Sequence, residues 1–276
     1  NITFNYGIKA EFPDIRNLAV GTILQSYNSL FEGNRTLENS WYHSFQLNYT
    51  NFNMFNFTNI YGGITYQKRY DNIVTGVNYA GLDRVSFPFN INAPNEVLSG
   101  YGNYQKRFTF MKIAADANWS YSKFFNEVDG NLNSNTSFTQ TYNLSAETNF
   151  KKWPNTEVGL RKVFNRYNGS GIKSTFVTTR PYGNVEVSFL KHFVLTADYE
   201  YNDYRNKNGG NSSQFDFLNA ALYYQGKDSP WEFKLSGLNL LNTTSIRQDG
   251  FSDNLISTYE YFVQPRYFLL SVKYKL

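Results

Sequence analysis

The sequence predicts an all-β protein, specifically a transmembrane antiparallel up-and-down β-barrel, on three observations. Polar and apolar residues alternate with a period of two in many short segments, which is the pattern of strands. Aromatic residues make up 19% of the 276 residues, with 23 Tyr and 25 Phe, and such barrels use aromatic girdles at both lipid interfaces. No apolar run approaches ~18 residues, so no transmembrane helix is expected. One barrel domain is expected over residues 1–276.

The last stretch of the chain, residues 259–276, shows the clearest terminal strand. Lys273 and Lys275 alternate with apolar residues over its final nine positions. A membrane barrel must pair its last strand with another strand, because an open edge cannot find hydrogen-bond partners in lipid. We therefore expect a barrel-closing C-terminal strand with the C-terminus in the periplasm. Its apolar face consists of Phe268, Leu270, Val272, Tyr274 and Leu276.

The other strands follow one another along the chain, separated by turns and loops. Strands are expected at 1–10, 40–50, about 55–68, a segment reaching 106, 112–121, 141–150, a segment from 156, its return reaching 189, 193–204, 215–224 and 231–242. Long loops are expected at 11–39, 69–94, 124–135, 165–171, 205–213 and 243–254. Most of them are rich in the turn residues Asn, Gly, Ser and Pro. This gives roughly twelve strands of about 9–15 residues, the length of tilted membrane strands.

The alternation also assigns each side chain to one of two faces. Residues 112–121 segregate most clearly, since apolar and polar residues occupy opposite sides of that strand. The lipid-facing residues are expected to be Ile113, Ala115, Trp119, Leu144, Leu195, Leu222, Phe233 and Leu235. The lumen-facing residues are expected to be Asp116, Glu147, Asp198, Glu200 and Lys234. One face suits lipid and the other suits water, as in a membrane barrel.

Connection lengths separate the barrel from its main alternative, a soluble antiparallel sandwich. If the C-terminus faces the periplasm, the short connections all fall on the periplasmic side and the long ones all fall outside. Outer-membrane barrels have this asymmetry. A soluble sandwich would also alternate, but it would not sort its connection lengths so consistently. The sequence therefore favours a protein of the bacterial outer membrane.

The sequence offers little sign of enzymatic chemistry. It contains no cysteine, and its two histidines, His43 and His192, form no metal-binding or catalytic motif. The predicted lumenal carboxylates share their face with Lys and Arg residues, so a hydrated, charge-balanced wall explains them better than an acid–base pair or a cation site. The net charge of +4 is spread along the chain without a basic block, which argues against nucleic-acid binding. We expect no catalytic residue, cofactor or metal.

Four segments resemble TonB-dependent receptor barrels of the Bacteroidota type. TRPYGNVEVSFLKHFVLTADYEYNDY (179–204) is similar to the part of those barrels that precedes their last strands. GNRTLENSWYHSFQLNY (33–49) resembles the GNPxLxPE element of that family, departing from it at Arg35 and Asn39. FKLSGLNLLN (233–242) resembles the family's penultimate-strand NLxN signature, and QPRYFLLSVKYKL (264–276) resembles its closing strand. The resemblance implies the C-terminal half of a barrel of roughly 22 strands. The plug, its TonB-contacting segment and the earlier strands would then lie outside this sequence.

The resemblance implies a receptor that imports or binds a scarce solute through extracellular loops and a plug. A second class is a non-transporting barrel that serves as a scaffold in a multi-protein outer-membrane complex. Expected partners are outer-membrane lipid, the barrel-assembly machinery through the C-terminal strand, TonB through the region outside this sequence, and a surface lipoprotein or other envelope proteins. A plug preceded by a TonB-contacting segment would favour transport over the scaffold.

The first strand raises a question about closure. Roughly twelve strands could close as a self-contained small barrel if residues 1–10 paired with residues 267–276. The chain begins with Asn1 and shows no signal peptide, which fits a mature product or a fragment. We therefore expect the outer edge of residues 1–10 to pair with a strand from outside this sequence, in an upstream segment of the same polypeptide.

Overall fold

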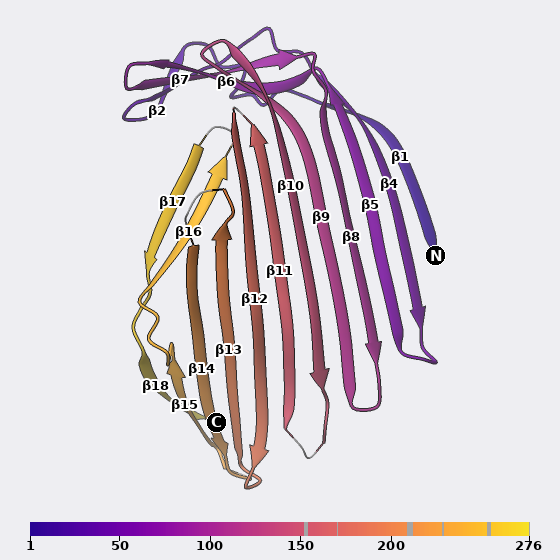
Figure 1. Cartoon of the computed structure of the whole chain (residues 1–276), viewed down its shortest axis with the longest axis vertical. Coiled ribbons are helices and arrows are strands. Elements are labelled where there is room, and N and C mark those ends of the chain that lie inside the picture. Colours follow the sequence, from indigo (N-terminus) through magenta and orange to yellow (C-terminus); the bar gives the residue numbers. More distant parts are fainter. Residues whose placement is uncertain (152–153, 170, 209–211, 228, 253–254, 276) are drawn as a thin grey trace.

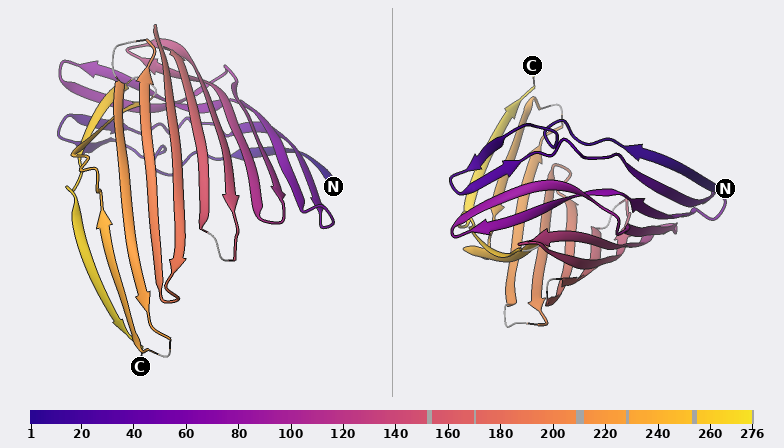
Figure 2. Two further views of the ribbon diagram at one scale, coloured as in Figure 1. Left: turned by 60° about the horizontal axis from the view of Figure 1, so that its bottom comes forward. Right: turned by 90° about the horizontal axis from the view of Figure 1, so that it is seen from above.

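The computed structural model describes the whole chain except residues 152–153, 170, 209–211, 228, 253–254 and 276. The described residues form strands joined by turns and loops, without a helix. Accordingly, none of them belongs to a helix with the length and apolarity to span a membrane. Consecutive strands along the main path of the large sheet, from β1 to β18, are antiparallel, and together they form a tall curved wall (Figures 1 and 2). The prediction of an all-β, antiparallel up-and-down architecture is confirmed.

Twelve of the described strands succeed one another in the main sheet. In spatial order they are β1 (Ile2–Glu11), β4 (Ser40–Asn53), β5 (Thr58–Tyr70), β8 (Asn95–Arg107), β9 (Met111–Val128), β10 (Asn131–Thr148), β11 (Asn155–Gly169), β12 (Ile172–Phe189), β13 (Phe193–Asn206), β14 (Ser212–Gln225), β15 (Trp231–Leu238) and β18 (Tyr267–Tyr274). Among the described residues, β1 and β18 are the two ends of this order and do not pair with each other. The sheet is therefore open, and closure into a transmembrane barrel stays a prediction.

The upper ends of the strands carry additional hairpins (Figure 1). They are built from β2 (Thr22–Ser26), β3 (Ser29–Glu32), β6 (Asn72–Ala80), β7 (Asp83–Ile91), β16 (Ser245–Ser252) and β17 (Leu255–Phe262). Strand β3 pairs with β7, and β6 pairs with the tip of β9. The connection between β1 and β4 and the connection between β5 and β8, which are distant in sequence, therefore form one layer. The stretches 11–39, 69–94 and 243–254, expected to be loops, thus contain strands.

The Asn-rich stretch 124–135 is also extended rather than looped. Strands β9 and β10 run through it and are joined by a two-residue turn at Asp129 and Gly130, both with positive φ (49° and 75°). This is the type I′ hairpin turn that an Asp-Gly pair favours. Strand β11 likewise runs through residues 165–169 of the stretch 165–171, and β13 and β14 extend into the two ends of the stretch 205–213. The connection between β9 and β10 is therefore a tight turn, contrary to the expectation that all upper connections are long.

The single closing strand expected over 259–276 is interrupted. Strand β17 ends at Phe262 and β18 begins at Tyr267, and Pro265 lies between them. Proline cannot donate to a strand ladder. The Asn239 Nδ2 donates to the Gln264 carbonyl (2.9 Å) and the Arg266 amide donates to Asn242 Oδ1 (3.1 Å), so side chains following β15 hold this break. Leu276, the last residue of the expected apolar face, lies outside the described residues.

Buried side chains concentrate at the upper end of the molecule. Phe31, Val74, Val77 and Ile91 belong to the hairpins, whereas Phe176 lies near the start of β12. Along the height of the sheet, by contrast, large apolar side chains of β1, β4, β10, β15 and β18 are exposed. The molecule therefore has a packed core in its loop layer and an apolar surface on its wall.

Candidate functional site

The strand register divides the wall into an apolar face and a polar face. Residues directly opposite each other in an antiparallel pair lie on the same face. Ala115 is opposite Leu144, and Leu195 is opposite Leu222, which is opposite Leu235. All eight residues expected to face lipid lie on this apolar face. Phe268, Leu270, Val272 and Tyr274 join it, because they pair with apolar-face residues of β15.

The five residues expected to face the lumen all lie on the opposite, polar face. Glu147 forms an ion pair with Lys112, and the Lys234 ammonium lies 4.9 Å from the centre of the Tyr223 ring. Asp116, Asp198 and Glu200 belong to the networks described next. Which face meets lipid and which meets water stays a prediction.

One row of polar side chains crosses five strands of the polar face. In register, it consists of Asn103, Asp116, Asn143, Arg161 and Arg180. The Asn103 Nδ2 donates to Asp116 Oδ1, and the Asn143 Nδ2 donates to Asp116 Oδ2 (3.3 Å), so two amides hold the carboxylate. The row therefore passes from an acidic group to two adjacent guanidinium groups.

A second row runs nearer the lower end of the sheet. It contains Glu147, Glu157, Asn184, Asp198 and Asn219 in register. The Asn184 Nδ2 donates to Glu157 Oε2 (3.0 Å), and the Asn219 Nδ2 donates to Asp198 Oδ2 (2.7 Å). Glu157 and Asp198 thus each have an amide partner from a neighbouring strand.

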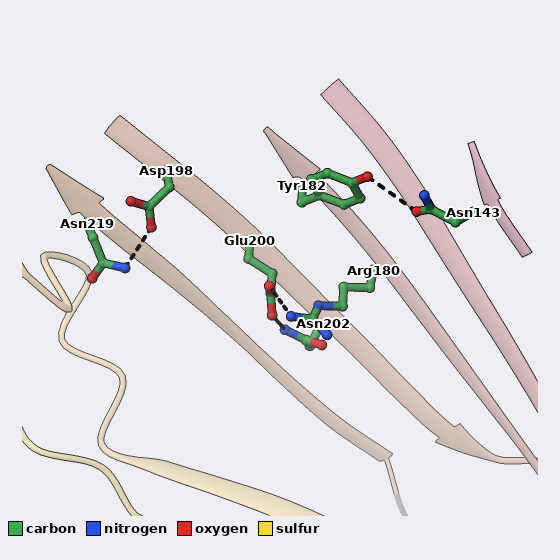
Figure 3. Close-up of polar contacts among 7 residues, drawn as sticks. All are labelled: Asn143, Arg180, Tyr182, Asp198, Glu200, Asn202 and Asn219. Atoms are coloured by element: carbon green, nitrogen blue, oxygen red, sulfur yellow. Dashed lines mark hydrogen bonds and ion pairs between the residues drawn. The ribbon is translucent and has the colours of Figure 1, made fainter. Parts of the chain in front are cut away.

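Between the two rows the polar face is hollowed, and we take this hollow as the candidate site. Its volume is about 280 Å³. Arg180 forms an ion pair with Glu200, and the second oxygen of Glu200 accepts from Asn202 Nδ2 (2.7 Å) (Figure 3). The Tyr182 hydroxyl donates to Asn143 Oδ1 (3.3 Å) across β11. The residues of the polar face that line the hollow are Asn143, Arg161, Arg180, Tyr182, Asn184, Asp198 and Glu200.

Part of this site was missed from the sequence. Asp198 and Glu200 were expected on this face, but Arg180, Tyr182 and Asn143 were not recognised as site residues. Their signal is weak, because the alternation of β12 is clear only after Gly183, where Val185 and Val187 lie on the apolar face. Continuing that alternation backward past Pro181 would have placed Arg180 and Tyr182 on the polar face.

The described part of the structure shows no cluster of metal-ligating side chains. No set of three or more His, Asp or Glu side chains there could hold a metal ion. His43 Nδ1 lies 2.8 Å from the Tyr6 hydroxyl, and the His192 ring contacts the Tyr224 ring (centroids 6.3 Å apart). Each histidine thus contacts an aromatic residue of a neighbouring strand.

These observations define an all-β protein whose main sheet has one apolar face and one polar face. The polar face carries a hollow lined by charged residues. No protein-family model, curated protein or solved structure matches the chain. Function must therefore be inferred from the residues of this chain.

Proposed function

We propose that this chain forms part of the wall of a TonB-dependent receptor-like barrel in the bacterial outer membrane, which imports or binds a scarce solute. The apolar face meets lipid, and the polar face lines the water-filled interior. The upper hairpins are extracellular. The transport role rests on the resemblance of four segments to that receptor family, together with the charged hollow on the inner wall.

The observation that carries the membrane assignment is the continuity of the apolar face from β1 to β18. Phe4, Leu144 and Leu270 are 63%, 57% and 67% exposed, although they lie at opposite edges and in the middle of the sheet. Soluble monomers rarely expose a contiguous apolar patch of more than a few hundred Å². Lipid contact gives such a face a favourable environment without any further protein layer.

Two features of the polar face favour an aqueous interior. Arg161, Arg180 and Glu200 lie midway along β11, β12 and β13, where contact with lipid would be costly. Most of them are only half-buried, and each of Asp116, Asp198 and Glu200 has protein hydrogen-bond donors. Water can solvate the remaining polar atoms.

The open edges of β1 and β18 extend this proposal. In hydrocarbon, unpaired backbone groups cost several kcal/mol each. We propose that strands from outside this sequence pair with both edges and complete the barrel. The self-contained small barrel would require a direct ladder between β1 and β18.

Single-cysteine labelling tests the membrane assignment, because this sequence contains no cysteine. Leu195→Cys and Asp198→Cys place thiols on opposite faces of one strand, three residues apart. In opened outer-membrane fragments, the thiol at 198 should react with a water-soluble maleimide, and the thiol at 195 should react with a lipid-confined reagent. Reaction of both thiols with the water-soluble reagent alone would indicate a soluble sheet and refute the proposal.

Uptake distinguishes the receptor from the scaffold. A strain lacking this protein should grow poorly when one nutrient is limiting, and loss of TonB should have the same effect. Growth that depends on this protein but not on TonB would favour the scaffold instead.

A further inference from the structure

We infer that the hollow on the polar face binds a solute that carries an oxyanion, a carboxylate or a phosphate, on a ring-shaped body. This inference deepens the proposed function by naming the class of solute. It rests on Arg161 and Arg180, which are direct partners across β11 and β12, and on Arg247 of β16, which lines an adjoining hollow.

The arrangement of the first two arginines is unfavourable by itself. Like charges directly opposite each other in a sheet repel and destabilise the pair. Arg180 is compensated by its ion pair with Glu200. Arg161 has no hydrogen bond or ion pair to a described residue, and its side chain lines the hollow of about 280 Å³. Its guanidinium group is therefore available to an incoming anion.

A second hollow, of about 340 Å³, adjoins the first, and the two share Arg180 and Glu200. Arg247 lines it from β16, which is outside the main sheet, together with the aromatic rings of Phe215 and Phe217. Those two rings lie on the polar face of β14, with centroids 5.8 Å apart. An apolar surface thus lies beside a set of cationic groups.

The charges around the two hollows favour an anion. Three guanidinium groups are accompanied by two carboxylates, Asp198 and Glu200. Asp198 accepts from Asn219, and Glu200 accepts from Arg180 and Asn202, so both carboxylates have partners. A planar guanidinium group binds carboxylate or phosphate through two parallel hydrogen bonds. Arg161 supplies this pair of parallel hydrogen-bond donors, the guanidinium fork, and Phe215 and Phe217 contact the ring of the solute.

The probes separate the parts of this inference. Binding of phenyl phosphate, benzoate, inorganic phosphate and benzyl alcohol is measured by calorimetry on the full-length protein in detergent micelles. Phenyl phosphate or benzoate should bind, and inorganic phosphate should bind more weakly because it lacks the ring. Neutral benzyl alcohol should not bind. Whichever of phenyl phosphate and benzoate binds more tightly identifies the oxyanion. Equal binding of benzyl alcohol, or no binding of either anionic ring compound, would overturn the inference.

Variants locate the site. Arg161→Gln should weaken binding of the anionic ring compound by about tenfold or more, and Arg161→Lys should weaken it less because the charge remains but the fork is lost. Arg247→Gln, on a separate element, should also weaken binding. Lys162→Gln is the matched control, because it removes the same charge from the next residue, on the apolar face. Equal losses for Arg161→Gln and Lys162→Gln would show non-specific attraction and overturn the assignment of the site.

The outcome is separable from that of the proposed function. If the labelling at 195 and 198 supports the barrel but Arg161→Gln binds as the wild type does, the anion site is wrong and the barrel stands. If the labelling fails, the membrane assignment is wrong whatever the probes do. Each variant is compared with the wild type by circular dichroism, so that loss of binding is not confused with loss of the sheet.

Discussion

The ring of Tyr182 on β12 lies directly across Gly159 on β11. A Cβ atom built at Gly159 would collide with the Tyr182 ring, and the Tyr182 hydroxyl reaches over the glycine to Asn143 Oδ1 on β10 (3.3 Å). Tyr101 repeats the arrangement: its ring lies across Gly63, and its hydroxyl donates to Asn48 Oδ1 (3.3 Å). In both places an aromatic side chain covers a glycine that would otherwise weaken the strand.

We predict that Gly159→Ala displaces the Tyr182 ring and breaks its hydrogen bond with Asn143. The expected loss of stability is about 1–3 kcal/mol, since a new methyl group is forced against a packed ring. Urea unfolding in lipid vesicles measures it. Gly7→Ala is the control, because a Cβ there meets no atom within 4 Å and the alanine reduces backbone freedom. Equal stability of the Gly159→Ala variant and the wild type would show that Tyr182 moves aside freely.

Leu144 tests the apolar face near the middle of the sheet. Its side chain is 57% exposed and lies between Ala115 and Leu160 of the neighbouring strands. If this site is near the bilayer midplane, Leu144→Arg should cost roughly 2–4 kcal/mol. Refolding into vesicles gives the free energy. Ser145→Arg, on the polar face, should cost less, and the opposite ranking would reverse the assignment of the faces.

Asn135 tests the packed upper end of the molecule. It is fully buried, its Nδ2 donates to Asn126 Oδ1 (2.7 Å), and its Oδ1 accepts from the Tyr167 hydroxyl (3.0 Å). Asn135→Ala removes both hydrogen bonds and leaves a space, so we expect a loss of about 1–3 kcal/mol. Ser134→Ala, on the other face of the same strand, should change stability by less than about 0.5 kcal/mol. Hydrogen exchange of the β9–β10 tip would show whether the loss is local.

The same asparagine explains why part of the fold could not be predicted. Asparagine favours turns, so the stretch from 124 to 135 was expected to be a loop. In the structure, Asn126 and Asn135 are buried and satisfied by partners on neighbouring strands. A local pattern carries no information about such partners. The segregation in 112–121, by contrast, belongs to one strand, and the β-strand prediction there is confirmed.

The candidate site was likewise only partly predictable from the sequence. The alternation of β13 placed Asp198 and Glu200 on the polar face, because that pattern lies within one strand. The opposition of Arg161 and Arg180 depends on the register of β11 against β12 and on the position of the turn between them. A shift of one residue would move Arg180 to the apolar face. Only the paired strands reveal that two guanidinium groups are neighbours.

The last prediction concerns the two open edges. Asn1 and Thr50 exchange both backbone hydrogen bonds (2.7 and 2.9 Å), so they form a hydrogen-bonded pair. Hydrogen-bonded and non-hydrogen-bonded pairs alternate along an antiparallel ladder, and Phe4 and Leu47, three positions further on, therefore form a non-hydrogen-bonded pair. The Cα atoms of such pairs are about 4.5 Å apart, within the range of a disulfide. The double variant Phe4→Cys, Leu47→Cys should therefore form a disulfide in the membrane under mild oxidation. The double variant Leu235→Cys, Leu270→Cys should also form a disulfide, between β15 and β18. The Lys275 amide donates to the Pro230 carbonyl (2.8 Å), so by the same alternation Leu235 and Leu270 form a non-hydrogen-bonded pair.

These two pairs are the positive controls for the edge test. In the complete polypeptide, the double variant Phe4→Cys, Leu270→Cys should form no intramolecular disulfide, because we propose that other strands separate β1 from β18. Neighbouring strands lie about 4.8 Å apart, so even one intervening strand would place these Cα atoms beyond the roughly 7 Å limit for a disulfide. Combining Phe4→Cys with Val272→Cys, and separately with Phe268→Cys, covers a register shift of two residues in either direction. A disulfide in any of these combinations, as efficient as in the controls, would mean that β1 and β18 pair directly and that the chain closes as a small barrel on its own.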